Sequence, residues 1–226
     1  MAVLRQARTG DGPPTVTSGR VNQKLRTRAA IVDAAQQLLE ARGAIPTVAE
    51  AAEAALVSRT TAYRYFPTQE SLVLELSVTV DVPAIEELVA RPVGPDDAVD
   101  RVLEVAGTFN EHVLADEELY RRAMRSYLDL WLAAREKDPA ESFPTVREGR
   151  RMRWFADSLA PLRESVPDAT LRRMQLALCM VMGSEAMVVM RDVCRLEPEE
   201  ALAVTRWAAR AILEAGLGEA GDAIDG

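Results

Sequence analysis

Apolar residues recur at helical spacing along most of the chain. One face of a predicted helix between Leu25 and Arg42 carries five of them: Ile31, Ala34, Ala35, Leu38 and Leu39. Gly43 follows, and glycine readily takes the left-handed conformation that ends many helices. Strand-like alternation of apolar and polar residues and internal repeats are both missing from the sequence. The pattern therefore predicts an all-α fold.

Short helices are predicted next, each preceded by a residue that can cap it. Thr47 can cap a second helix, and Glu50 three residues later can complete a reciprocal capping box. Ser58 can cap a third helix over residues 58–65. Pro67 prevents simple continuation, and Thr68 can cap a fourth helix. Two short helices with a tight turn between them, flanked by longer ones, predict a helix-turn-helix module.

The rest of the chain carries further helix signals. Start signals stand at residues 94–97, Asp116, residues 145–148, Asp168 and Pro198. The helix that Asp168 opens is predicted to extend to Met190, and the helix from Pro198 to Gly216. Pro83 is expected to break or kink the connection after the fourth helix, and residues 139–144 are expected to form a loop.

Charge is distributed unevenly between the two ends of the chain. Residues 1–72 hold nine Lys and Arg against six Asp and Glu, a net charge of +3, whereas the whole chain carries −8. Six of these cations precede the first strong apolar pattern, in a tail rich in Gly, Pro and Thr that is expected to be largely disordered. We predict a basic tail over 1–22, a helix-turn-helix domain over 23–74, a larger helical domain over 75–218 and a flexible C-terminus over 219–226.

Several classes of function find little support in the sequence. His112 is the only histidine, and none of the common catalytic or metal-binding motifs occurs, so we expect no catalytic residue, metal or cofactor. No apolar run reaches the roughly 18 residues of a membrane span, and the N-terminus lacks the apolar core of a secretion signal. We therefore expect a cytoplasmic protein without a membrane partner, and unpaired thiols at Cys179 and Cys194.

The third predicted helix carries the residues suited to DNA. Arg59, Thr60 and Thr61 can meet base edges in a major groove, and the hydroxyls of Tyr63 and Tyr65 can donate to phosphates. Phe66 should point inward, because three aromatic residues within four positions cannot share one helix face. The predicted DNA-binding residues are Thr47, Ser58, Arg59, Thr60, Thr61, Tyr63, Arg64, Tyr65 and Gln69.

Residues 28–72 resemble the DNA-binding domain of the TetR family of bacterial transcriptional regulators. Seven positions match the family pattern: Val57, Ser58, Tyr63, Tyr65, Phe66, Glu70 and Leu72. Four depart from it: Leu56 replaces the turn glycine, Ala51 an isoleucine, Ala62 a leucine and Gln69 a lysine. Leu56 must then adopt the turn geometry that glycine usually takes. Gln69 removes a cation that the resemblance assigns to phosphate contact, which lowers the expected affinity for DNA.

The resemblance implies that the larger domain dimerises and binds a small effector. Two apolar stripes on the last long helices supply a predicted dimer interface, although packing within one chain is the alternative: Val181, Val189, Leu202, Thr205, Ala209 and Ile212. Large or aromatic residues on the middle helices supply a predicted effector pocket, although each could be ordinary core: Phe109, Met124, Tyr127, Leu128, Trp131, Trp154, Phe155, Met174 and Met182. Arg125, Asp129 and Glu185 could add polar selectivity.

Two hypotheses for function follow from these residues. The first is a homodimeric repressor that binds double-stranded operator DNA and leaves it when a mostly apolar effector binds. The alternative is a helical module that binds or converts a small molecule and retains a degenerate helix-turn-helix. Salt-dependent binding to DNA would distinguish the two.

Overall fold

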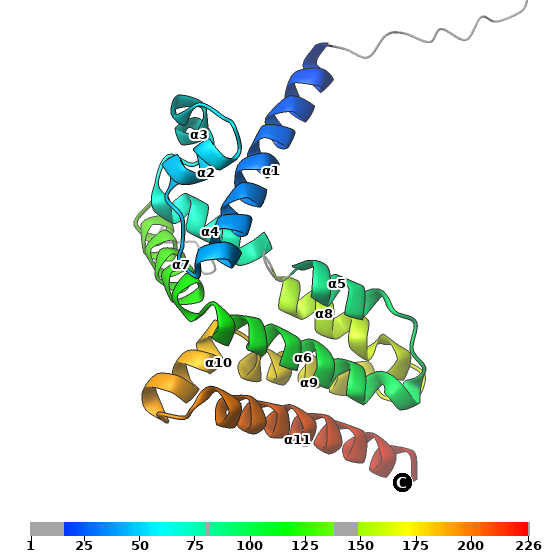
Figure 1. Ribbon diagram of the computed structural model, residues 1–226. Coiled ribbons are helices and arrows are strands. Elements are labelled where there is room, and N and C mark those ends of the chain that lie inside the picture. Colours follow the sequence, from blue (N-terminus) through cyan, green and yellow to red (C-terminus); the bar gives the residue numbers. More distant parts are fainter. Residues whose placement is uncertain (1–15, 80–81, 138–148, 226) are drawn as a thin grey trace, which may run out of the picture. The chain divides into compact units, whose positions relative to one another are not determined.

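A computed structural model describes residues 16–79, 82–137 and 149–225, and every regular element within these ranges is helical (Figure 1). The prediction of an all-α fold is confirmed for this part of the chain. Two compact units are distinguished, one ending at Pro67 and the other beginning at Thr68. Residues 1–15 of the predicted tail, the predicted loop 139–144 and the start signal at 145–148 lie outside the described ranges.

The first unit contains α1 (Val16–Arg42), α2 (Val48–Ala54) and α3 (Arg59–Tyr65). Gly43 ends α1 with φ of 63°, and its N–H donates to the carbonyl of Leu39 at 2.8 Å. This is the left-handed cap that the sequence predicted. Side chains from all three helices are buried in this unit: Ile31, Ala35, Val48, Ala51, Ala62 and Phe66. The alanines among them allow the short helices to approach closely.

The beginning of α1 differs from the sequence prediction. Residues 16–22, which we assigned to a disordered tail, belong to the helix. Adding a residue to an existing helix costs far less than nucleating one, so α1 can extend beyond the segment that packs. Residues 21–26 are exposed.

The second unit contains the remaining helices. They are α4 (Gln69–Thr79), α5 (Val82–Ala90), α6 (Ala98–Ala115), α7 (Glu117–Lys137), α8 (Arg150–Leu159), α9 (Asp168–Val181), α10 (Ser184–Val188) and α11 (Pro198–Asp225). Short 3₁₀ turns over Pro95–Asp97 and Ala160–Leu162 precede α6 and follow α8, and a π-helical turn spans Val189–Val193. The predicted helix starts after Asp116 and at Asp168 and Pro198 are confirmed. Pro83 occupies the first turn of α5. N–H groups in the first turn have no partner within a helix, so a proline there costs no hydrogen bond.

The main core of the second unit lies among α5, α6, α8, α9 and α11. Ile85, Leu103, Phe155, Leu178 and Leu213 are among its fully buried side chains. In Figure 1, α6 and α11 lie side by side, and α9 packs against α11.

A buried cation closes one end of this core. Arg101 on α6 is almost fully buried and donates to the carbonyl of Val89 at 2.9 Å and to the carbonyl of Arg91. Val89 lies in the last turn of α5, whose carbonyls have no partner within the helix, and Arg91 directly follows the helix. The guanidinium thereby ties the end of α5 to α6.

The prediction of a single helix from Asp168 to Met190 is wrong, because the helix ends at Val181. Met182 is extended and Gly183 has φ of 112°, a conformation in which other residues are strained. The break is held by side chains of two other helices. Arg151 of α8 donates to the carbonyl of Met182 at 2.6 Å, and Asn110 of α6 bonds both Val181 and Gly183. Cys179 and Cys194 therefore belong to different elements, and both are free thiols.

The end of α11 also differs from its prediction. The helix passes Gly216 and reaches Asp225, although residues 219–226 were expected to be flexible. Gly216 packs against Met174 of α9 so closely that a Cβ would lie 2.4 Å from the Met174 sulfur. The glycine thus serves the contact between two helices, and the sequence could not separate this role from that of a helix terminator. Ala220, one turn further on, is 2% exposed and extends the packed face.

Candidate DNA-binding surface

The turn between α2 and α3 is a Schellman motif built around Leu56. The N–H of Val57 donates to the carbonyl of Ala52 at 2.9 Å, and the N–H of Leu56 to that of Glu53 at 3.1 Å. These two bonds define the motif, and its central residue must be left-handed. Leu56 has φ of 55° and is 95% exposed, so a leucine accepts the glycine conformation without burying its side chain. The expected turn geometry is confirmed.

We expect Leu56→Gly to stabilise the first unit by about 0.5–1 kcal/mol. A left-handed conformation costs a residue with a Cβ about 1–2 kcal/mol, and the greater freedom of glycine in the unfolded chain offsets part of the gain. Urea unfolding measured by circular dichroism would detect the change. Leu56→Ala is the matched control, because it removes the exposed side chain but keeps the Cβ. Equal effects of the two substitutions would contradict backbone strain at this turn.

The start of α2 is the predicted capping box. The Thr47 side chain accepts from the N–H of Glu50 at 3.2 Å, while the Glu50 carboxylate accepts from the N–H and the hydroxyl of Thr47, each at 2.8 Å. Arg42 also pairs with Glu50 at 3.0 Å. The Thr47 N–H, the Thr47 hydroxyl and the Arg42 charge together lower the pKa of Glu50. The box fixes where α2 begins and keeps Thr47 exposed beside it.

The side chains of α3, the helix predicted to contact DNA and called the recognition helix below, and of the Phe66 that caps it divide between solvent and core. Arg59, Thr60 and Arg64 are exposed and Tyr63 is 48% exposed, whereas Tyr65 is half-buried beside Arg64. Phe66 is 1% exposed, and the Arg28 guanidinium lies 5.4 Å from its ring centroid. The prediction that Phe66 points inward is confirmed. The exposed side chains are available to DNA because Phe66 and Ala62 hold the opposite face of the helix.

Two of the predicted DNA-contacting hydroxyls have a structural role. Ser58 accepts from the N–H of Thr61 at 3.2 Å and donates its own hydroxyl hydrogen to the Thr61 oxygen at 2.8 Å. Ser58 is therefore the cap of α3, and Thr61 is partly buried beside it. Gln69 is the first residue of α4, in the second unit. The DNA contacts assigned to these residues stay predictions.

Residues 31–76 match the family model described as "Bacterial regulatory proteins, tetR family". The match includes the capping box, the turn at Leu56 and the whole of α3. Residues 31–76 are therefore a DNA-binding domain of the TetR family. As members of this family are regulators that bind operator DNA, the chain is a DNA-binding transcription regulator with a helix-turn-helix domain and a larger helical C-terminal domain. No curated protein matches the chain.

The structure does not bring the nine predicted pocket residues of this chain together. Trp154, Phe155, Met174 and Met182 belong to the buried core, and Phe109 packs at its edge. Met124 and Tyr127 are half-buried on α7, and Leu128 and Trp131 are 58% and 41% exposed on the same helix. The second half of α7 is apolar on several faces, so its spacing could not identify the buried one. Arg125 lies 3.9 Å from Asp129, and Glu185 pairs with Arg151.

The six predicted interface residues are also divided. Thr205 and Ala209 are buried within the chain and have almost no surface left for a partner. Val181, Leu202 and Ile212 are half-buried, and Val189 is 45% exposed. Other large apolar side chains on α9 and α11 are more exposed than these half-buried residues: Leu176, Met180, Val204 and Trp207. Helical spacing identified the packed face of α11, and tertiary contacts show that this face meets α6 and α9.

Asn110 is a buried polar residue of the second unit whose role sequence reasoning missed. It is 2% exposed, and its amide donates to the Val181 carbonyl and the Thr205 hydroxyl while its oxygen accepts from the Gly183 N–H. A polar residue in the apolar pattern of residues 98–115 was the available signal.

Within the described ranges, no helix is long and apolar enough to cross a bilayer. The same ranges contain no grouping of three His, Cys, Asp or Glu side chains fit to hold a metal.

Proposed function

We propose that the chain is a homodimeric transcriptional repressor that leaves its operator when a small, mostly apolar effector binds the larger unit. The observation that carries the proposal is the recognition helix, whose exposed face presents Arg59, Thr60 and Tyr63 while Phe66 holds the other face. Arginine can bond the edge of guanine with two hydrogen bonds, and Tyr63 can reach a phosphate. We assign base recognition to Arg59 and positioning on the backbone to Tyr63.

A second copy of the chain supplies the other half of the operator contact. Half-sites about 34 Å apart require two recognition helices related by a two-fold axis. Exposed apolar side chains on α9 and α11 suit such a pairing: Leu176, Met180, Val204 and Trp207. Trp207 is 71% exposed, and a large aromatic side chain that is buried on association contributes strongly to binding. We place the interface on this face instead of on Thr205 and Ala209.

An aromatic cluster supports an apolar effector. Phe109 lies 6.0 Å from Tyr120 and 5.8 Å from Trp154, measured between ring centroids. The Tyr120 hydroxyl is buried and has no hydrogen-bond partner in the described chain. A buried donor without a partner is costly, and an effector with an acceptor atom would satisfy it. We place the effector beside these rings, with its binding shifting the population away from the DNA-bound arrangement.

DNA binding tests the proposal. Fluorescence anisotropy with duplexes selected from a random-sequence pool should show two chains per site and an affinity that falls steeply with salt. Arg59→Ala should reduce the preference for the selected sequence by about 1–3 kcal/mol, since base contacts carry specificity. Arg42→Ala is the control, because Arg42 pairs with Glu50 and lies outside α3. Equal loss on every sequence would remove Arg59 from base recognition, and salt-independent or absent binding would contradict the proposal.

A further inference from the structure

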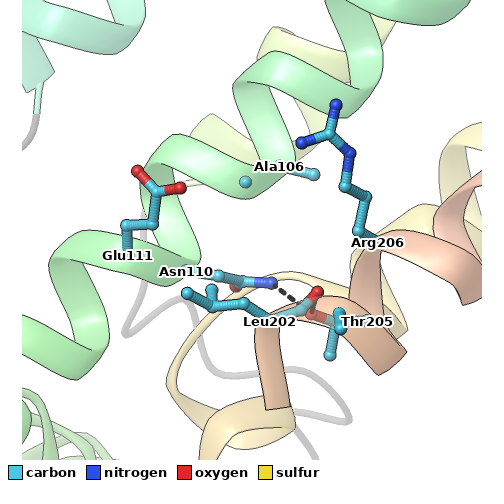
Figure 2. Close-up of a pocket in the computed structure, with 8 residues that line it drawn as sticks. Ala106, Asn110, Glu111, Leu202, Thr205 and Arg206 are labelled. Carbon is cyan, nitrogen blue, oxygen red and sulfur yellow. Dashed lines mark hydrogen bonds between the residues drawn. The ribbon is translucent and has the colours of Figure 1, made fainter. Parts of the chain in front are cut away.

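A groove of about 200 Å³ lies between α6 and α11 of the second unit (Figure 2). Its lining comprises Ala106, Gly107, Asn110 and Glu111 from α6 with Leu202, Ala203, Thr205 and Arg206 from α11. Small residues keep it open. A Cβ added to Gly107 would meet no atom within 4 Å, so nothing fills the space above this turn of α6.

Opposite charges stand on the two sides of this groove. In Figure 2 the Glu111 carboxylate and the Arg206 guanidinium lie on opposite sides of the opening. Neither side chain forms a hydrogen bond or an ion pair with any residue in the described part of the chain. One turn along α11, Arg210 does reach across the same two helices and lies 3.7 Å from Asp100. An ion pair therefore joins α6 and α11 at Asp100 and Arg210. At the groove, Glu111 and Arg206 have no such partner among the described residues.

The middle of the groove is suited to an apolar group. The Asn110 amide donates to the Thr205 hydroxyl at 3.3 Å, and the same side chain also bonds Val181 and Gly183 (Figure 2). The Thr205 hydroxyl donates within α11 to the carbonyl of Ala201 at 3.0 Å. Since these polar groups already have partners, a ligand meets chiefly the methyl groups of Ala106, Leu202 and Ala203. The volume is below the about 300–1,000 Å³ of pockets for drug-sized molecules, so the ligand must be compact.

We propose that this groove binds a small dipolar ligand with a cationic group at one end, a carboxylate at the other and a short apolar chain between them. The ammonium pairs with Glu111, the carboxylate accepts hydrogen bonds from Arg206, and the chain covers the floor. The ω-amino carboxylates are the simplest members of this class. Binding here goes beyond the proposed function, because it requires neither DNA nor the apolar effector near Phe109.

Isothermal titration calorimetry on the full chain without DNA tests the site. A series from 4-aminobutanoate to 8-aminooctanoate should contain a member that binds saturably with Kd in the millimolar range or below. The carboxylate and the amine that match this member in chain length but lack one charge should bind about tenfold more weakly, since each loses one charge-assisted contact. Binding of either single-charge probe as tightly as the dipolar one would overturn the proposal, as would saturable binding by no member of the series.

Variants locate the binding. Arg206→Gln and Glu111→Gln should each weaken the dipolar ligand about tenfold and abolish its advantage over the probe that lacks the corresponding charge. Arg210→Gln, which removes the same charge one turn away, should leave the affinity unchanged. Equal losses for Arg206→Gln and Arg210→Gln would mean a general effect of net charge, and the proposal would fail.

Filling the groove separates binding from folding. Gly107→Leu should abolish binding without lowering the thermal midpoint, because leucine favours the helix more than glycine does and the space is empty. Gly218→Leu is the matched control, since Gly218 is also helical and also has no atom within 4 Å of an added Cβ. Ligand binding by folded Gly107→Leu at the original affinity would place the ligand elsewhere and overturn the proposal. Should Gly107→Leu unfold the second unit, the charge variants alone decide the outcome.

Discussion

Phe66→Ala should destabilise the first unit by about 3–5 kcal/mol and abolish operator binding. Truncation of a buried phenylalanine removes its transfer free energy and leaves a cavity that a small domain closes only in part. Phe66 is 1% exposed and is the largest side chain in the core of this unit. The loss of the Arg28 contact adds to the effect. Because a domain is stable by only about 5–15 kcal/mol in total, much of the first unit should be unfolded at physiological temperature.

Urea unfolding measured by circular dichroism would test this expectation, together with operator binding by anisotropy. Tyr63→Ala is the matched control, because Tyr63 lies in α3, the helix that Phe66 caps, but is 48% exposed. It should cost the unfolding free energy less than about 1 kcal/mol while weakening DNA binding. Similar stability losses for the two variants would show that the buried face of α3 is assigned incorrectly.

Asn110→Leu should destabilise the second unit by about 2–5 kcal/mol. Leucine has a similar size but cannot accept from the Gly183 N–H or donate to the Val181 carbonyl, which Asn110 contacts at 2.8 Å and 3.0 Å. Leaving a buried donor or acceptor without a partner costs about 1–3 kcal/mol each. Both groups lie at the break between α9 and α10, where the helices themselves provide no bond. The break should therefore open more often in the variant than in the natural chain.

Thermal unfolding combined with amide hydrogen exchange would measure this effect. The Gly183 amide should exchange much faster in Asn110→Leu, because its partner oxygen is gone. Thr205→Val is the control, since it removes only the weaker contact of 3.3 Å to Asn110 and the hydroxyl bond within α11. It should cost about 1 kcal/mol and leave exchange at Gly183 nearly unchanged. An Asn110→Leu variant as stable as Thr205→Val would contradict a structural role for the amide.

Local signals in the sequence were sufficient to predict the DNA-binding unit. Thr47 with Glu50, Ser58 and Gly43 define helix ends through bonds within a few residues of themselves, so their roles do not depend on the rest of the fold. Phe66 could be placed inward because the helix period leaves it no other face. The left-handed turn at Leu56 was expected from the resemblance to the TetR family, whose pattern has glycine at this position. The early start of α1 was missed, because a helix can extend beyond the segment that packs.

The larger unit was less predictable, because its details depend on contacts between residues far apart in the chain. Gly216 reads as a helix end in the sequence, and only the approach of Met174 shows that it is a packing contact. The break at Gly183 is stabilised by Asn110 and Arg151, which lie 73 and 32 positions earlier.

Apolar spacing identified the packed face of α11, but it could not decide whether that face meets helices of the same chain or a second copy. The sequence by itself thus determined the all-helical class and the helices of the first unit through local bonding and helix periodicity, and it indicated the family through the motif that residues 28–72 share with it. The tertiary structure decided which of the chemically similar apolar faces are buried, because burial depends on the neighbour that covers each face.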